Sequence, residues 1–125
     1  MVKRLLVVEG DAETRSLIRA VAASEQRIEV ADEVTTAEAA ILLAAKNQPD
    51  LIVLDHLLPG TLRGIDAAPD LKIAAPNASI LVIGSEALAT RAESQRGVDA
   101  FLGRRQLVQW FLPTVRRLLG LPVSP

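Results

Sequence analysis

Residues 51–60 read LIVLDHLLPG, in which four unbroken aliphatic residues run directly into an aspartate. An apolar run of this length, without alternating polar residues, is typical of a strand that is buried on both faces, as in parallel sheets. The stretch therefore predicts a central strand over Leu51–Leu54, with Asp55 at its carboxyl end.

Four other short apolar runs lie on either side of this strand, and segments with helical spacing separate them. These runs are Leu5–Val8, Ile28–Ala31, Ile80–Ile83 and Ala100–Leu102. The strict alternation of strands and helices predicts an α/β fold, a three-layer sandwich in which helices cover both faces of a five-stranded parallel sheet.

The first two predicted helices each begin at a capping residue. Asp11 suits the N-cap of the first helix, and Thr35 or Thr36 that of the second, because short polar side chains accept hydrogen bonds from free N–H groups. Helical spacing predicts that these residues face the core: Leu17, Ile18 and Val21 in the first helix, and Ala40, Ile41, Ala44 and Ala45 in the second.

Three further helices are predicted towards the C-terminus. One falls within 65–74 and is weakened by Pro69, and the next falls within 86–96 and is closed by Gly97. The last contains Pro113, where the helix is expected to kink or restart. Its apolar stripe consists of Leu107, Trp110, Phe111, Val115, Leu118 and Leu119. The sequence leaves open whether this stripe closes the core or forms an interface.

Composition excludes several classes of function. The chain has 125 residues, the size of one domain, and 14 basic against 15 acidic residues give a net charge of -1. This balance predicts no direct binding of nucleic acid and no attraction to anionic membranes. The sequence contains no cysteine and one histidine, so thiolate chemistry and histidine-rich metal sites are excluded. His56 is expected to be a solvent-facing loop residue.

The N-terminus predicts a cytoplasmic protein without a membrane segment. The apolar run Leu5–Val8 is only four residues long before Glu9-Gly10-Asp11 ends it. Such a run is too short for the apolar part of a signal peptide. No apolar run approaches the roughly 18 residues that a membrane helix needs. Whether the chain stands alone or is part of a longer protein stays open.

Charged and small residues follow the predicted strands. Glu9 and Asp11 follow the first strand, Asp55 the third, Ser85 the fourth and Arg104 the fifth. In open α/β sheets, ligands bind outside the carboxyl ends of the strands, so these side chains are expected to meet at one edge. This convergence is the main functional signal of the sequence.

Three segments make the chain similar to a response-regulator receiver domain, the phosphoacceptor module of two-component signalling. Residues 51–60 resemble the family's strand, phosphoacceptor aspartate and Pro-Gly turn. Residues 7–11, followed by Arg15, resemble the acidic end of its first strand, and residues 97–104 resemble its glycine, switch aromatic and terminal-lysine segment. The resemblance covers about residues 3–119 and implies a receiver domain over 1–120 with a short tail over 121–125.

The resemblance implies a flavodoxin-like fold with strand order 2-1-3-4-5 and a set of site residues. Asp55 is the implied phosphoacceptor, Arg104 takes the place of the family's lysine, and Phe101 that of its switch residue. The implied Mg²⁺ ligands are Glu9, Asp55 and the backbone carbonyl of Leu57, with Asp11 as a possible substitute. Beyond self-phosphorylation and self-dephosphorylation on Asp55, no enzymatic activity is expected.

The resemblance also implies partners for the chain. Upstream these are a sensor histidine kinase or a phosphotransfer protein, and downstream a protein target. The face formed by the fourth helix, the fifth strand and the fifth helix is the implied surface for docking or homodimerisation.

Three departures from the family pattern predict weakened phosphorylation. Gly10 stands where the family has a second acid, so Mg²⁺ binding is expected to be weak or absent. Gly84 stands in place of the family's hydroxyl residue, and Ser85 beside it is either a phosphate contact or a helix cap. Arg105 replaces a proline, so a trans peptide bond is expected there. Arg104 is predicted to pair with Asp55 or Glu9.

Three functions follow from these observations. In the first, phosphorylation of Asp55 persists at a reduced rate. In the second, the domain is a pseudo-receiver that acts only as a phosphorylation-independent docking surface. The third is a small flavodoxin-like protein that binds a nucleotide or flavin, which the acidic residues after the first strand disfavour because they would repel a phosphate.

Overall fold

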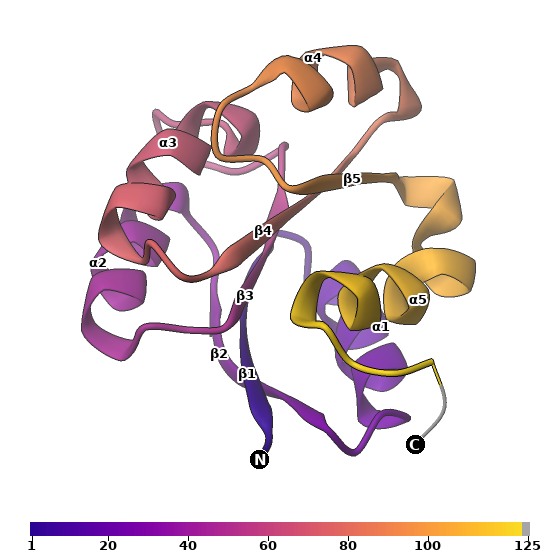
Figure 1. Ribbon diagram of the computed structural model, residues 1–125. Coiled ribbons are helices and arrows are strands. Elements are labelled where there is room, and N and C mark those ends of the chain that lie inside the picture. The colour runs from indigo at the N-terminus through magenta and orange to yellow at the C-terminus, as the bar shows by residue number, and fades with distance from the viewer. Residues whose placement is uncertain (124–125) are drawn as a thin grey trace.

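The computed structural model describes residues 1–123 and consists of one parallel sheet with helices on both faces (Figure 1). The strands are β1 (Lys3–Val8), β2 (Ile28–Val34), β3 (Leu51–Asp55), β4 (Ser79–Gly84) and β5 (Ala100–Gly103). The helices are α1 (Ala12–Ala23), α2 (Ala37–Asn47), α3 (Gly64–Ala74), α4 (Ala89–Ser94) and α5 (Leu107–Leu119), with single 3₁₀ turns η1 (Glu86–Leu88) and η2 (Arg104–Gln106). The order β2-β1-β3-β4-β5 confirms the predicted α/β fold and strand order.

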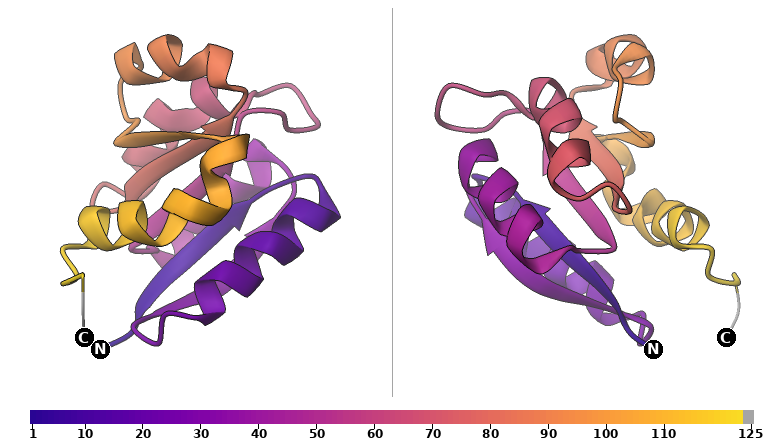
Figure 2. Two further views of the ribbon diagram at one scale, coloured as in Figure 1. Left: turned by 90° about the vertical axis from the view of Figure 1, so that its right-hand side faces the viewer. Right: turned by 60° about the vertical axis from the view of Figure 1, so that its left-hand side comes forward.

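The sheet is covered on both faces, which explains why the inner strands β1, β3 and β4 are almost continuously buried, whereas the edge strand β2 alternates between covered and exposed residues. α1 and α5 lie on one face and α2 and α3 on the other, while α4 lies beyond them near β5 (Figures 1 and 2). Within β1, Leu5 and Val7 pack towards α1 and α5, whereas Leu6 and Val8 pack towards α2 and α3. Every residue of β3 is buried, so its end is held rigidly in the centre of the sheet.

The first two helices begin at the predicted caps. Asp11 Oδ2 accepts a hydrogen bond from the Thr14 N–H at 3.0 Å, and Thr36 rather than Thr35 caps α2. Two predicted core positions are wrong, because Leu17 is 39% exposed and Ala45 is exposed as well. A helix on a flat sheet buries only a narrow stripe, and both residues lie beside that stripe rather than on it.

The C-terminal helices differ in detail from the prediction. α4 ends at Ser94, ahead of Gly97, which instead forms a turn with φ of 94°. α5 does not restart at Pro113 but runs unbroken and is closed by Gly120. Its apolar stripe divides between core and surface, because Phe111 is fully buried whereas Trp110 is 46% exposed.

An ion-pair cluster ties the end of α5 to the loop between α1 and β2. Glu25 is only 6% exposed and accepts hydrogen bonds from both Arg27 and Arg116. The Arg27 guanidinium also donates to the Pro122 carbonyl at 3.0 Å, and Leu121 packs against the core. Of the predicted tail over 121–125, residues 124–125 lie outside the described part of the chain.

The helices within residues 1–123 are all too short or too polar to cross a lipid bilayer.

Candidate functional site

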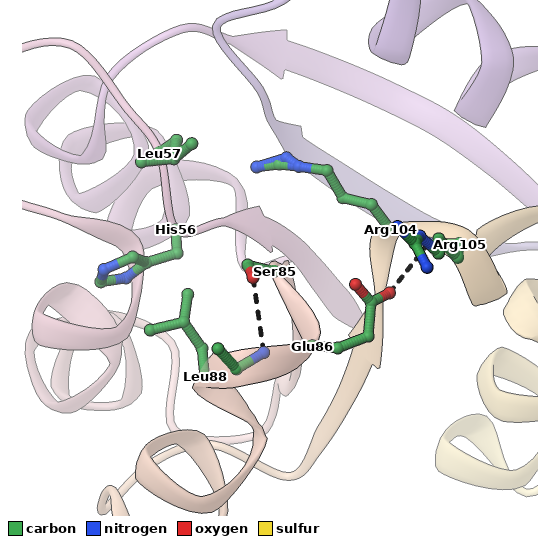
Figure 3. Close-up of a pocket in the computed structure, with 8 residues that line it drawn as sticks. His56, Leu57, Ser85, Glu86, Leu88, Arg104 and Arg105 are labelled. Carbon is green, nitrogen blue, oxygen red and sulfur yellow. Dashed lines mark hydrogen bonds between the residues drawn. The ribbon is translucent and has the colours of Figure 1, made fainter.

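Asp55 lies at the carboxyl end of the central strand and is almost completely buried, with 3% of its surface exposed. Its Oδ1 atom accepts two hydrogen bonds, one from the Leu57 N–H at 3.1 Å and one from Arg104 Nη2 at 2.5 Å. Arg104 follows β5, and its side chain reaches across the sheet edge towards Leu57 (Figure 3). The ion pair predicted between Arg104 and Asp55 is therefore present, through a single guanidinium nitrogen.

Glu9 is the second buried acid of this edge and is 1% exposed. Its Oε2 accepts the Asp11 N–H at 3.2 Å, whereas Oε1 has no hydrogen-bond partner within residues 1–123. Burial, followed by the neighbouring Asp55 carboxylate, raises the pKa of Glu9 to about 8. With Glu9 protonated at neutral pH, the pair of acids bears a single negative charge, which the Arg104 guanidinium balances.

The carboxylate of Asp11 is engaged at the start of α1. Asp11 Oδ2 accepts hydrogen bonds from the Thr14 hydroxyl at 2.6 Å and from the Thr14 N–H at 3.0 Å. These two bonds lower the pKa of Asp11. Asp11 thus fills the capping role predicted for it, and metal coordination by its carboxylate would compete with that role.

The two glycines that depart from the family pattern are both covered by neighbouring side chains. A Cβ atom on Gly10 would lie 3.0 Å from Cδ of Pro59, in the loop after β3. A Cβ atom on Gly84 would lie 3.0 Å from Cδ1 of Leu88 and 3.6 Å from Cε1 of Phe101. A side chain at either position would therefore press on Pro59 or Leu88, which would have to shift slightly to admit it.

The remaining predicted residues surround this edge. Ser85 Oγ accepts the Ala87 N–H at 3.4 Å and so caps η1 (Figure 3). Phe101 is partly buried and packs on the α2 and α3 side of the sheet. The peptide bonds of the described residues are all trans, as predicted before Arg105, and the Arg105 N–H donates to Glu86 Oε2 at 3.1 Å.

His56 is a correction to the sequence prediction, because it is buried with 8% of its surface exposed. Its Nδ1 atom accepts the Ile65 N–H at 3.2 Å, in the first turn of α3. The residue before that helix, Arg63, gives no side-chain cap, so the imidazole satisfies a free N–H group in its place. A neutral histidine directly after the central strand is thus a structural part of the site.

Gly64 was not predicted to matter, yet it packs directly against the Asp55 backbone. It begins α3, and its N–H donates to the His56 carbonyl at 3.0 Å. A Cβ atom at this position would lie 2.2 Å from the Asp55 carbonyl oxygen. Only a glycine fits there, and the single sequence signal was its place immediately before the predicted helix.

We expect the free energy of unfolding to decrease as the pH falls, because the buried His56 resists protonation in the folded protein. Burial, and next the Arg91 guanidinium, lower the pKa of His56 below its ordinary value of 6.5. The neutral imidazole therefore stabilises the fold at pH values above 6.5, the ordinary pKa of histidine. This contribution is lost as the pH falls from there through the lowered pKa that His56 has in the folded protein. Urea unfolding between about pH 7.5 and 5.5 should show a steeper loss for wild type than for His56→Asn.

The asparagine variant is a matched control because its Oδ1 can accept the Ile65 N–H but cannot titrate in this range. Equal pH slopes for the two proteins would contradict the role given to His56.

The donor set of this edge does not fit a resident Mg²⁺ ion. Within residues 1–123 no group of three or more acidic or histidine side chains is arranged to hold a metal. The Asp55 Oδ1 atom is already bound by Arg104, and Gly10 supplies no carboxylate. Mg²⁺ prefers near-octahedral coordination by several oxygen atoms. At this edge, Glu9 Oε1 is the buried side-chain oxygen without a hydrogen-bond partner within residues 1–123.

Comparison with known families and curated proteins identifies related sequences. A family model described as the response regulator receiver domain matches residues 5–104. The protein-glutamate methylesterase/protein-glutamine glutaminase 2 of Paramagnetospirillum magneticum is 34% identical over 79 residues, which are 63% of this chain and 22% of that protein. The corresponding protein 3 of Myxococcus xanthus is 36% identical over 96 residues, 77% of this chain and 25% of that protein. This chain thus spans about a quarter or less of these relatives.

Solved structures share the fold at lower identity. The response regulator domain of Thermotoga maritima CheB superposes with a TM-score of 0.83 at 23% identity, covering 98% of this chain and 99% of that one. A putative response regulator from Chloroflexus aurantiacus gives a TM-score of 0.85 at 21% identity, with 96% and 99% covered.

Proposed function

Because the chain belongs to the response regulator receiver domain family, we propose that it signals by protein–protein contact and that Asp55 is its phosphoacceptor. The observation that supports this role is the position of Asp55. It is the acid at the end of the central strand, between the acid that follows β1 and the cation that follows β5. The family match gives no support to the nucleotide- or flavin-binding alternative.

The proposed reaction is transfer of a phosphoryl group from a phosphohistidine of a sensor kinase or phosphotransfer protein. An Asp55 carboxylate oxygen forms a bond to phosphorus while the phosphorus–nitrogen bond breaks, and the released imidazole takes up a proton. Arg104 balances the added negative charge. Transfer is slow, because the guanidinium occupies Oδ1 at 2.5 Å and must move before that oxygen can react.

We expect a small phosphodonor such as acetyl phosphate to add at most one phosphoryl group, on Asp55. Intact mass measurement of wild type and of Asp55→Asn checks this, since the amide cannot form the acyl phosphate. Asp66→Asn is the matched control, because Asp66 is an exposed acid of α3 whose side chain is 44% accessible. A mass increase that persists in Asp55→Asn would refute the assignment.

We also propose that the wild-type chain has little affinity for Mg²⁺, because the donor set at this edge does not fit the ion. Gly10→Asp restores a carboxylate and Gly10→Asn has nearly the same bulk beside Pro59 without the charge. Amide NMR titration should therefore show roughly tenfold tighter binding for the aspartate variant than for wild type or Gly10→Asn. Equal affinities in the three proteins would mean that Glu9 and Asp55 already suffice.

A second candidate function is a docking module that does not need phosphorylation. Gly84 favours it, because the residue at the end of β4 has no hydroxyl that could contact a phosphoryl group. In this case acetyl phosphate would leave both the mass and the amide NMR spectrum of wild type unchanged. The face of α4, β5 and α5 is the proposed surface for the target or for a second copy, with Val108 and Trp110 exposed on α5.

A further inference from the structure

A pocket of about 510 Å³ lies between the loop after β3 and the 3₁₀ turns η1 and η2 (Figure 3). Arg104, which lines it, is the ion-pair partner of Asp55. The loop after β3 forms one wall, η1 forms the floor, and η2 closes the far side. This volume lies within the range of about 300–1000 Å³ that is common for small-molecule sites. Of the residues that line this pocket, the phosphotransfer proposed for Asp55 uses Arg104.

The walls of the pocket are largely apolar. Leu57 lines it and leaves 62% of its surface exposed, although it adjoins two buried residues. Ala87 and Leu88 line it from η1, and the hydroxyl of Ser85 is turned to the Ala87 N–H. A ligand with an apolar body would bury these side chains, which water now contacts.

The polar side of the pocket presents guanidinium groups with free N–H donors. The Arg104 guanidinium extends over the pocket towards Leu57 (Figure 3). Within residues 1–123 its only acceptor is Asp55 Oδ1, through Nη2, so the N–H groups on Nε and Nη1 are free. Arg105 forms no ion pair with a described residue, and the one acid of the lining, Glu86, accepts the Arg105 backbone N–H.

We propose that this pocket binds a free small-molecule monoanion, a carboxylate attached to an apolar body, with the carboxylate on the unused N–H groups of Arg104. The unused N–H groups of Arg104 support the anion, and so does the Arg105 guanidinium, which forms no ion pair with a described residue. The apolar walls support the body, and the volume of about 510 Å³ supports a small molecule. The proposal does not depend on phosphorylation of Asp55.

Phenylacetate and phenylacetamide test the proposal, because they have the same shape and size but differ in charge. In amide NMR titrations, phenylacetate should give saturable shifts confined to residues 57, 85–88 and 104–105 at concentrations up to about 10 mM. Phenylacetamide should bind at least about fivefold more weakly. In Arg104→Gln the two compounds should bind equally, because the variant lacks the cation.

The apolar wall has its own variant and control. Leu57→Asp places a negative charge beside the ligand and should weaken phenylacetate binding at least about fivefold. Leu42→Asp makes the same change at a residue of α2 that is 76% exposed and does not line the pocket, and it should have no effect. Absence of saturable shifts, equal affinity of wild type for both compounds, or equal loss in the two aspartate variants would overturn the proposal.

Discussion

Replacing Gly64 by alanine is expected to lower the free energy of unfolding by about 3 kcal/mol or more. The added Cβ would lie 2.2 Å from the Asp55 carbonyl oxygen and 2.8 Å from Cα of His56, and both of these atoms belong to the backbone. Neither can rotate away, so the start of α3 and the end of β3 must separate. The gain of about 0.5–1 kcal/mol that alanine usually brings to a helix is too small to offset this.

Gly84→Ala is the matched control for this prediction. There the new Cβ would meet Cδ1 of Leu88 at 3.0 Å, an atom at the far end of a flexible side chain. The expected loss is within about 1 kcal/mol. Urea unfolding of both variants measures the difference, and a similar loss in the two would mean that the loop after β3 yields easily.

Phe111→Ala is expected to cost about 3–5 kcal/mol, whereas Trp110→Ala should cost no more than about 1 kcal/mol. Phe111 is fully buried against the core between the sheet and the helices α1 and α5. Its neighbour Trp110 leaves 46% of its surface in solvent, so its removal creates no closed cavity. Denaturant unfolding of the two variants makes the comparison.

Light scattering over a concentration series adds a second readout for Trp110. If the face of α4, β5 and α5 joins two copies of the chain, Trp110→Ala should weaken self-association while leaving stability nearly unchanged. A strict monomer in which Trp110→Ala costs as much stability as Phe111→Ala would contradict the division of this helix into a core side and an exposed side.

The centre of the sheet could be predicted from the sequence because the strands β1, β3 and β4 are buried on both faces. Leu51–Leu54 is apolar at every position, and a short unbroken run of this kind is typical of a strand buried on both faces. Predictions were less accurate for helix faces, where a shift of one residue turns a side chain by about 100°. Leu17 next to the buried Ile18, and Trp110 next to the buried Phe111, show how one position decides between core and solvent.

The candidate site was only partly predictable for a related reason. The acids and Arg104 follow strands, so the topology of a parallel sheet brings them together. Contacts between loops do not follow from periodicity, and the sequence therefore did not reveal that Pro59 covers Gly10 or that Leu88 covers Gly84. The burial of His56 depends on the return of the chain at α3, a tertiary contact without a local signal.

The ends of the described chain also bear on how binding can be measured. β1 begins at the amino ends of the parallel strands, whereas Asp55 lies at their carboxyl ends, and α5 returns to the side where β1 begins (Figure 2). There Arg116 and Arg27 fasten the last turn through Glu25. An affinity tag or surface anchor attached at Met1 would therefore lie away from Asp55, and an immobilised protein would present the edge with Asp55 and the pocket to an analyte in solution.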